Sequence, residues 1–520
     1  MGTWVPPNDA VDLALLAAPS ASIDACMRHV SAHQESTRIP AGTVSVERKV
    51  GRLAGLLEEN GTVVLVVAAF AAVLITHLRT ALAQDGWMAL LSGRVVAHGL
   101  PSHDTLTVWA HGRTWIDQQW LAQLVLYGLD RLGGLALVLL VHVALVTLGL
   151  AAAAVLARRL GGSARSVTWV ALPVLVAFWP GAAVMRPQSF AYALFVGVLW
   201  LLLDDLERPS RRVFLTLPLL VLWANLHGSV VVGSALAFGY AVVELAGSLW
   251  RQPRTVHARS LVLLAAPWLC VLASPYAASL PRYYHTIFTG GFGSYVTEWA
   301  PTTLTLMHAP IYLLALGGLW LLKGSRASAF EKLAFLGLSL LAFDAERNGV
   351  WLALISLVVL PRLLDALRAP AEEPKAMNRM LAIAMLVGVV IATVAVGFKP
   401  ASWFTRGQYP AAAADDASAA AGLHGRIFAN EKYADWLVFE HPQLAGRIAY
   451  DSRFELLESR QLQSVTAFRS RVGGWRSTLR GYDVFVLDRM DDHLPIRALL
   501  QAGQARVVLR RGPVLVLRRR

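Results

Sequence analysis

Apolar segments long enough to cross a lipid bilayer recur along most of this chain, and they constrain its fold more than any other feature. A spanning helix needs about 20 mainly apolar residues, because the hydrocarbon core is ~30 Å thick. Only 16% of the 520 residues are charged, too few to cover a soluble protein of this length. We predict a mainly α-helical, polytopic membrane bundle of about eleven spans, near residues 61–83, 133–157, 166–184, 188–205, 213–225, 229–249, 260–277, 308–323, 329–343, 348–366 and 377–398.

The short loops between these segments indicate the orientation of the chain. If the N-terminus is cytoplasmic, every loop on the cytoplasmic side carries Arg or Lys, namely residues 157–165, 204–212, 251–259, 323–332 and 362–379. Cytoplasmic loops of membrane proteins are enriched in these residue types. The sequence therefore predicts a multi-pass protein of the cytoplasmic membrane, with a cytoplasmic N-terminus and an extracytoplasmic C-terminal part.

The net charge of +13 is not evidence for nucleic-acid binding, because the basic residues gather in these loops. The sequence has no phosphate-binding loop, zinc-ligand spacing or RNA-binding signature, so we expect no nucleic-acid partner. Its two cysteines, Cys26 and Cys270, lie far apart and define neither a disulfide framework nor a metal cluster.

Three parts follow from composition. Residues 1–58 are mixed and polar, and we expect a poorly ordered cytoplasmic tail that ends in a short amphipathic helix over 50–57. Residues 59–398 form the transmembrane domain, whose first outer loop is 84–131, and 411–421 is an alanine-rich linker. Residues 399–520 form a small α/β domain with a partly parallel sheet. We expect strands at 425–430, 447–450, 484–488, 506–510 and 514–517, and helices at 432–439, 456–472 and 495–502.

The first outer loop combines polar motifs with aromatic residues. Apolar residues at helical spacing over 121–132 predict a helix that lies in the membrane interface. Trp and Tyr are enriched at membrane interfaces, so four tryptophans of this loop are expected to be interfacial anchors: Trp87, Trp109, Trp115 and Trp120.

Ionisable and amide side chains gather where the spans end on the outer side. The stretch WANLHGS, residues 223–229, shows this best, because an apolar segment ends there on Asn225 and His227. These two residues either cap a helix at the lipid surface or line a reaction site. Ionisable groups that converge at such a boundary are functional candidates, which here are Asp85, Asp104, Arg186, Gln188, Asn225, His227, Arg282, Glu298 and Arg347.

This mixture of side chains suits sugar transfer from a lipid-linked phosphate. A carboxylate can take a proton from an acceptor hydroxyl, and arginine or imidazolium can neutralise the charge on a leaving phosphate. The reaction requires no cofactor. The oxygen and nitrogen ligands of Asp85, Asp104, His103 and Glu298 are compatible with Mg²⁺ or Mn²⁺, although no ligand spacing demands a metal.

The order of several motifs resembles bacterial members of the GT-C glycosyltransferase superfamily, from about Gln84 to the C-terminus. The motifs are D-x-W after the first span, then H-G-x-P-x-x-D, G-R-x-W-x-D-x-x-W-L, R-P-Q, W-A-N-L-H-G, S-P-Y, E-W-x-P, R-N, A-N-E-K-Y-A-D-W-L and A-Y-D-S-R. The resemblance implies a polytopic hexosyl- or pentosyltransferase. Such enzymes take a sugar from a polyprenyl-phosphate carrier on the outer side of the membrane, here for an envelope lipid, glycan or protein acceptor.

The resemblance assigns the family's catalytic acidic residue to Asp85, which would act as the general base. Many relatives carry a second acid where this chain has Gly86, and often a Trp and a His where it has Met88 and Ala89. Asp104 and Asp117 are alternative bases. Asp451 and Arg453 are expected to form an internal salt bridge.

Two other functions remain open at this stage. A transporter or flippase of lipid-linked glycans would place charges or broken helices at mid-bilayer and show repeat symmetry. A non-catalytic envelope scaffold would use the C-terminal domain for docking. The polar groups gather at one end of the spans, which favours chemistry at a membrane face.

Overall fold

Helices account for each of the expected membrane segments in the computed structural model, which describes residues 41–251, 258–368 and 375–520. The tail before residue 41, with Cys26, lies outside the described residues, and residues 57–520 form one compact unit. The helices that match the expected segments are α2 Ala41–Ala81, α4 Trp120–Arg159, α5 Ala164–Ala182, α6 Ser189–Glu207, α7 Thr216–Leu226, α8 Val230–Arg251, α9 Ala258–Val271, α11 Ala309–Lys323, α12 Ala329–Asp344, α13 Gly349–Asp365 and α14 Lys375–Gly397.

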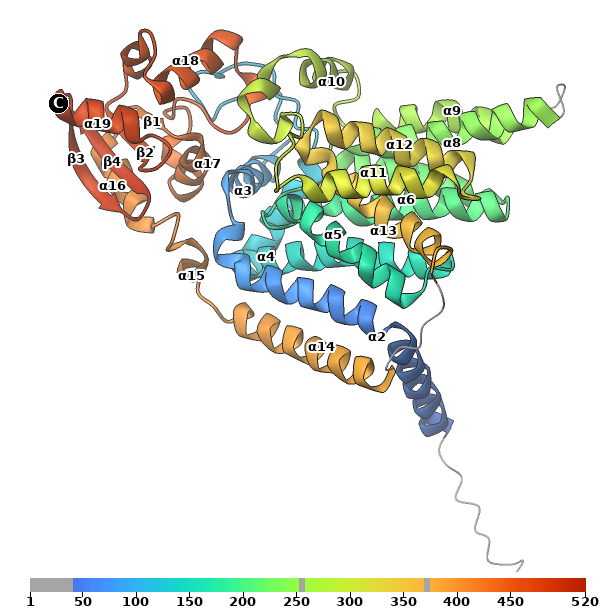
Figure 1. Cartoon of the computed structure of the whole chain (residues 1–520). Coiled ribbons are helices and arrows are strands. Elements are labelled where there is room, and N and C mark those ends of the chain that lie inside the picture. The colour runs from blue at the N-terminus through green and yellow to red at the C-terminus, as the bar shows by residue number, and fades with distance from the viewer. Residues whose placement is uncertain (1–40, 252–257, 369–374) are drawn as a thin grey trace, which may run out of the picture. The chain divides into compact units, whose positions relative to one another are not determined.

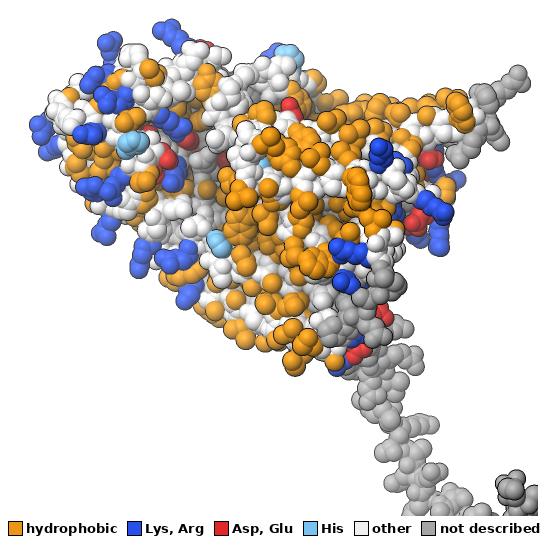
Figure 2. All heavy atoms as spheres, viewed as in Figure 1, with side chains coloured by type: hydrophobic (Ala, Val, Ile, Leu, Met, Phe, Trp, Pro, Cys, Tyr) orange, Lys and Arg blue, Asp and Glu red, His pale blue; other side chains and the backbone are white. Residues whose placement is uncertain are grey.

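Six of these helical regions are long and apolar enough to cross a membrane, those of α2, α4, α6, α8, α13 and α14, while α9 and α11 are apolar but shorter. Helix α13 lies at the centre of the bundle, and its Trp351 packs against the rings of Tyr192, Phe195 and Trp223. Helix α14 lies at the edge beside α2 (Figure 1). Only 11% of the residues in its apolar stretch are buried. Hydrophobic side chains also cover the helical part in Figure 2. This is the surface of a membrane-embedded bundle.

The two ends of the bundle differ in chemistry. At one end, which we call the basic end, the Arg- and Lys-bearing loops are tied to neighbouring helices. There Asp365 accepts hydrogen bonds from the backbone and hydroxyl of Ser163 at 2.6 Å, and Arg362 pairs with Glu331. At the other end, which we call the polar end, lie the remaining connections and the C-terminal domain.

The first outer loop begins with α3, Gln84–Val96, and runs into the long helix α4. The expected interfacial helix over 121–132 is the first part of α4, which breaks at Gly133 and Gly134 before the membrane span. Gly134 has φ 63°, a left-handed conformation that glycine adopts without strain. Leu132, just before the break, is 82% exposed, as expected for a helix that lies on a lipid surface.

The C-terminal domain is built around a four-stranded sheet in the order β1-β2-β4-β3. Strand β1 pairs parallel to β2, and the other pairs are antiparallel, which confirms the expected partly parallel sheet. Its elements are α15 Ala401–Thr405, α16 Ala411–Ala421, β1 Ile427–Ala429, α17 Glu431–Glu440, α18 Ser459–Ser470, β2 Val484–Asp488, α19 His493–Gln501, β3 Ala505–Arg511 and β4 Val514–Arg519.

The remaining helices are short. They are α10 Leu280–Thr289 and the 3₁₀ turns η1 Arg211–Leu215, η2 Phe292–Tyr295, η3 Thr297–Trp299, η4 Glu346–Asn348, η5 Pro442–Leu444, η6 Phe454–Leu456 and η7 Trp475–Leu479. Two of these turns, η3 and η4, lie at the polar end and carry the candidate site residues Glu298 and Arg347.

Two local predictions for the C-terminal domain are wrong. The segment 411–421 is not a linker but helix α16. Alanine has the highest helix propensity, and residues 413, 414, 417 and 421 of the segment are buried at helical spacing. Residues 447–450 form no regular strand. Instead, Ile448 makes isolated bridges to Thr107 and Ile427, which joins the first outer loop to the sheet.

The first outer loop packs against the C-terminal domain as an additional extended segment. The amides of Val108 and Trp109 donate to the carbonyls of Ile448 and Ala449 at 2.8 and 3.0 Å. Trp109 stacks on Tyr450 with ring centroids 5.0 Å apart. These contacts make the loop and the domain one structural unit.

Two of the loop tryptophans are core residues and not interfacial anchors. Trp87 and Trp115 are 1% and 3% exposed. Trp87 packs against Tyr409 and Phe439 of the C-terminal part. The prediction failed for them because the domain covers the loop and excludes both lipid and water.

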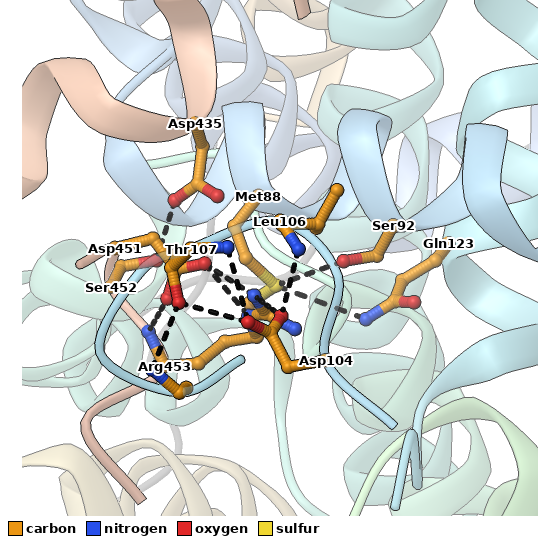
Figure 3. Close-up of polar contacts among 11 residues, drawn as sticks. Met88, Ser92, Asp104, Leu106, Thr107, Gln123, Asp435, Asp451, Ser452 and Arg453 are labelled. Carbon is orange, nitrogen blue, oxygen red and sulfur yellow. Dashed lines mark hydrogen bonds and ion pairs between the residues drawn. The ribbon is translucent and has the colours of Figure 1, made fainter. Parts of the chain in front are cut away.

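A buried ion-pair cluster fastens this unit together (Figure 3). Arg453 lies 2.5 Å from Asp104 of the loop and 2.5 Å from Asp451, and its guanidinium stacks on Trp115 at 4.2 Å. Asp104 also accepts from the Thr107 hydroxyl at 2.9 Å. This Arg453 cluster confirms the expected Asp451–Arg453 salt bridge.

We expect Arg453→Met to destabilise the protein by about 3–5 kcal/mol, because it leaves two carboxylates buried without their cation. Arg113→Met is the matched control. It removes an ion pair between the same two segments whose partners are 31% and 66% exposed, and one hydrogen bond to the Leu456 carbonyl, together worth about 1–2 kcal/mol. Denaturant unfolding of the detergent-solubilised protein measures both. Equal losses in the two variants would contradict the structural role of the Arg453 cluster.

Candidate active site

Four charged residues from distant parts of the chain meet at the polar end. Arg186 pairs with Asp85 at 2.9 Å and with Glu298, and Arg347 lies 3.7 Å from Glu298. Their side chains are 21–28% exposed, so the Arg186 cluster is shielded but remains accessible. All four were singled out in the sequence, where the first and the last lie 262 positions apart.

The end of α2 sets the distance between Asp85 and Arg186. The chain passes from α2 into α3 within two residues, so Asp85 lies in the first turn of α3, where a helix favours negative charge. The amide of Met185 donates to the carbonyl of Ala81 at 2.8 Å, which holds the turn between α5 and α6 beside α3. Arg186 follows directly and reaches the carboxylate.

The glycine of the Asp-Gly-Trp motif fits this close packing. A Cβ atom at Gly86 would lie 2.8 Å from Leu82 Cδ1 and 3.1 Å from Met185 Cε. A second acidic residue at this position would have to displace both side chains. Glycine thus allows close packing against the Arg186 turn, although the ends of these two side chains could move for a larger residue.

Glu298 and Arg347 reach the cluster from two short turns that are tied to each other. Glu298 lies in η3 and Arg347 in η4, and the amide of Glu346 donates to the carbonyl of Ala300 at 3.1 Å. The Arg347 guanidinium lies 4.4 Å from the centre of the Trp299 ring, within cation–π range. Arg347 is thus held at the rim of the cluster by a ring and a carboxylate.

The two carboxylates of the cluster have different acidities. Burial raises the pKa of Asp85 above 3.8, and the nearby charge of Glu298 adds to this, while Arg186 and Arg347 oppose it. Burial also disfavours ionisation of Glu298, but Arg186 and Arg347 outweigh it and lower the pKa of Glu298 below 4.5. Asp85 is therefore the more basic of the two and the better proton acceptor.

The polar groups of WANLHGS make different contacts. The Asn225 amide is a structural link: it accepts from Trp120 Nε1 at 2.9 Å and donates to the carbonyls of Val221 and Ala273 at 2.9 and 2.7 Å. His227 Nδ1 accepts from the amide of Ser229 at 3.1 Å, which leaves Nε2 to carry the proton in a neutral ring. His227 lies close enough to Arg186 and Arg347 for both charges to act on it.

Three other predicted residues lie outside the Arg186 cluster. Asp104 is fully buried against Arg453 and has no exposed surface for a substrate. Gln188 is 4% exposed and precedes α6, two residues after Arg186. Arg282 lies exposed on α10 and makes no ion pair with any described residue.

Two further carboxyl groups lie between the first outer loop and the C-terminal domain, Asp117 near Arg453 and Glu455 within electrostatic range of Asp85. Burial raises the pKa of Asp117 to about 7, against the lowering effect of Arg453. Burial likewise raises the pKa of Glu455 to about 7, and the charge of Asp85 adds to this shift. Glu455 was not singled out in the sequence, where its position two residues after Arg453 is the one available signal. Its proximity shows that the C-terminal domain reaches the site.

The side chains considered for a divalent metal do not converge. Asp85 and Glu298 both bind the Arg186 guanidinium, and Asp104 binds Arg453 in a different cluster. Within the ranges that the structure describes, no group of three or more His, Cys, Asp or Glu residues is arranged to hold a metal ion. Among the described residues, the carboxylates of Asp85, Asp104 and Glu298 are therefore engaged by arginines and do not form a common metal site.

Solved structures identify the fold. The crystal structure of ArnT from Cupriavidus metallidurans bound to undecaprenyl phosphate matches with a TM-score of 0.51 at 17% identity, over 88% of this chain and 98% of that chain. The oligosaccharyltransferase of Archaeoglobus fulgidus in the apo form matches at 0.45 and 12% identity, over 82% and 70%. No protein-family model and no curated protein sequence matches this chain. The chain therefore has the fold of ArnT, and the expected GT-C-like architecture is confirmed.

We expect Asn225→Ala to lower the unfolding free energy by about 1–3 kcal/mol, because it removes the hydrogen bonds that join the Trp120 indole and the Ala273 carbonyl to α7. Asn348→Ala is the matched control, since this asparagine of a neighbouring turn makes one described side-chain bond, to Leu341 at 3.1 Å. Thermal unfolding in detergent compares the two variants. A loss no larger than that of the control would show that Asn225 does not hold these segments together.

Proposed function

We propose that this protein is an inverting membrane glycosyltransferase that moves a sugar from a polyprenyl-phosphate donor to a cell-envelope acceptor. The observation that carries the proposal is the contact between Asp85 and Arg186, a carboxyl of raised pKa beside a fixed cation at the polar end of a membrane bundle. The fold it shares with ArnT, which was crystallised with undecaprenyl phosphate, supports the choice of donor.

In the proposed reaction, Asp85 accepts the proton of an acceptor hydroxyl. The oxygen then forms a bond to the anomeric carbon of the sugar, while the bond from that carbon to the phosphate oxygen breaks. The electron pair of the broken bond stays on the polyprenyl phosphate, which leaves with an additional negative charge. An ionised Asp85 is needed at the start, and its raised pKa makes it a stronger base than an ordinary aspartate.

Arg186 and Arg347 are the cations proposed to stabilise the leaving phosphate. Guanidinium groups offer paired N–H donors that match phosphate oxygens. Both arginines are held in place by Glu298, so they need little reorganisation as charge develops. His227, with its proton on Nε2, is a further candidate hydrogen-bond donor to the phosphate.

The position of the cluster suits a lipid-linked donor. It lies where α2, α5 and α12 end, so the phosphate of a carrier would sit at the depth of lipid headgroups while its chain remains among the helices. The basic loops lie at the opposite end, so the positive-inside rule puts the cluster and the C-terminal domain on the extracytoplasmic side. The candidate polar groups gather at one end of the bundle and not at mid-bilayer. This arrangement favours a reaction at one membrane face over transport of a glycan through the bundle.

We expect Asp85→Asn to slow sugar transfer by about 10²–10⁴-fold, while the amide preserves the shape of the site and the fold. Asp344→Asn is the control, because Asp344 is an exposed acid at the same end of the bundle. Both variants are expressed in a deletion strain, and envelope glycans are analysed by mass spectrometry for one missing sugar.

Full complementation by Asp85→Asn would contradict the role of Asp85 as the base. Unchanged glycans in the deletion strain itself would contradict a transferase and favour the scaffold function.

The rate of transfer should fall as the pH falls through the pKa of Asp85, because only the ionised carboxylate accepts the proton. Burial places this pKa above 3.8, and Arg186 lowers it. Arg186→Gln should therefore move the acid limb to higher pH as well as slow the reaction. The pH profile of transfer in isolated membranes measures this shift.

Asp117→Asn and Glu455→Gln are the controls for this profile, because the pKa of each carboxyl is about 7. An acid limb that moves in either control, and not in Arg186→Gln, would assign the titration to another carboxyl.

A further inference from the structure

A large cavity lies at the basic end, away from the Arg186 cluster. Its volume is about 1090 Å³, and it is formed where α6, α11, α12 and α13 approach the basic loops. The volume is large enough for a ligand of several hundred daltons. The proposed transfer reaction makes no use of this basic-end cavity.

Charge in the cavity is asymmetric. Arg362 and Glu331 pair with each other, and Glu331 also accepts from the amide and hydroxyl of Ser328 at 2.9 Å. Lys323 and Arg326 are exposed on the same wall and have no acidic partner within the described ranges. Glu207 is the remaining acid in the lining, so the cavity keeps a net positive charge.

The rest of the wall is apolar and continues to the outside of the bundle. Leucine side chains of α6 and α13, including Leu203, Leu206 and Leu363, line the interior. At the edge, Trp320 is 69% exposed and Leu367 is 60% exposed. A tryptophan beside basic residues at the end of an apolar helix is typical of the headgroup region of a bilayer.

We propose that the basic-end cavity binds an anionic phospholipid of the membrane. Its phosphate headgroup contacts Lys323 and Arg326, and an acyl chain lies along Leu203, Leu206 and Leu363. Basic pockets between membrane helices bind anionic headgroups through such contacts. The leucine wall selects a lipid over free phosphate, because a small anion leaves this surface uncovered.

The test uses the full-length protein in nanodiscs of equal parts phosphatidylglycerol and phosphatidylcholine, with retained lipids counted by native mass spectrometry. We expect wild type to retain phosphatidylglycerol in preference to phosphatidylcholine, and the Lys323→Gln/Arg326→Gln double variant to bind it about tenfold or more weakly. Arg211→Gln/Arg212→Gln is the charge-matched control, because both arginines are exposed in a neighbouring basic loop and do not line the cavity. The control should behave as wild type.

Equal loss in the two double variants would overturn the proposal, because it would show a general attraction of basic loops to anionic lipid. Equal retention of phosphatidylcholine and phosphatidylglycerol by wild type would overturn it too. A Leu206→Trp variant, which fills the cavity without changing charge, should also lose the bound lipid, and normal retention there would show that the lipid binds outside the cavity. Competition by inorganic phosphate at the same concentration as the lipid would favour a free anion instead.

Discussion

One guanidinium shared by two carboxylates organises the polar end of this protein. Arg186 lies between Asp85, which follows the first membrane helix, and Glu298, which lies more than two hundred residues further along the chain. Removing either carboxylate from water without a cation would cost free energy. Here the two carboxylates and the two arginines, Arg186 and Arg347, compensate each other's charge. The set is accessible enough to meet a substrate and fixed enough to need little rearrangement.

The C-terminal domain completes this arrangement from the outside. Its contact with the first outer loop rests on the Arg453 cluster, on backbone hydrogen bonds and on buried tryptophans. The loop begins with Asp85, so the domain and the proposed base belong to one continuous unit. Burial raises the carboxyl pKa of Glu455, which belongs to this unit and lies within electrostatic range of Asp85. The domain therefore shapes the electrostatics of the site.

Much of the helical part could be predicted from the sequence because hydropathy is a local property. Each expected segment contains a helix, and the turns that alternate between the two ends brought Asp85, Arg186, Glu298 and Arg347 to the same end. What the sequence could not show depends on contacts between distant segments. Trp87 and Trp115 have the composition of interfacial anchors, but a domain more than three hundred residues away covers them. Asp104 and Asn225 are polar residues in outer connections, as the cluster residues are, so the sequence could not tell them apart. Their hydrogen bonds to Thr107 and Trp120 stabilise the fold.

We propose that a polyprenyl-phosphate sugar binds with its anomeric carbon facing Asp85 and its phosphate at Arg186 and Arg347. A cryo-EM structure of the protein with such a donor analogue tests it most directly. We expect density for the phosphate in contact with the two guanidinium groups, and the Asp85 carboxylate free to reach an acceptor. A donor bound away from the Arg186 cluster, with the Asp85–Arg186 pair closed and untouched, would contradict it.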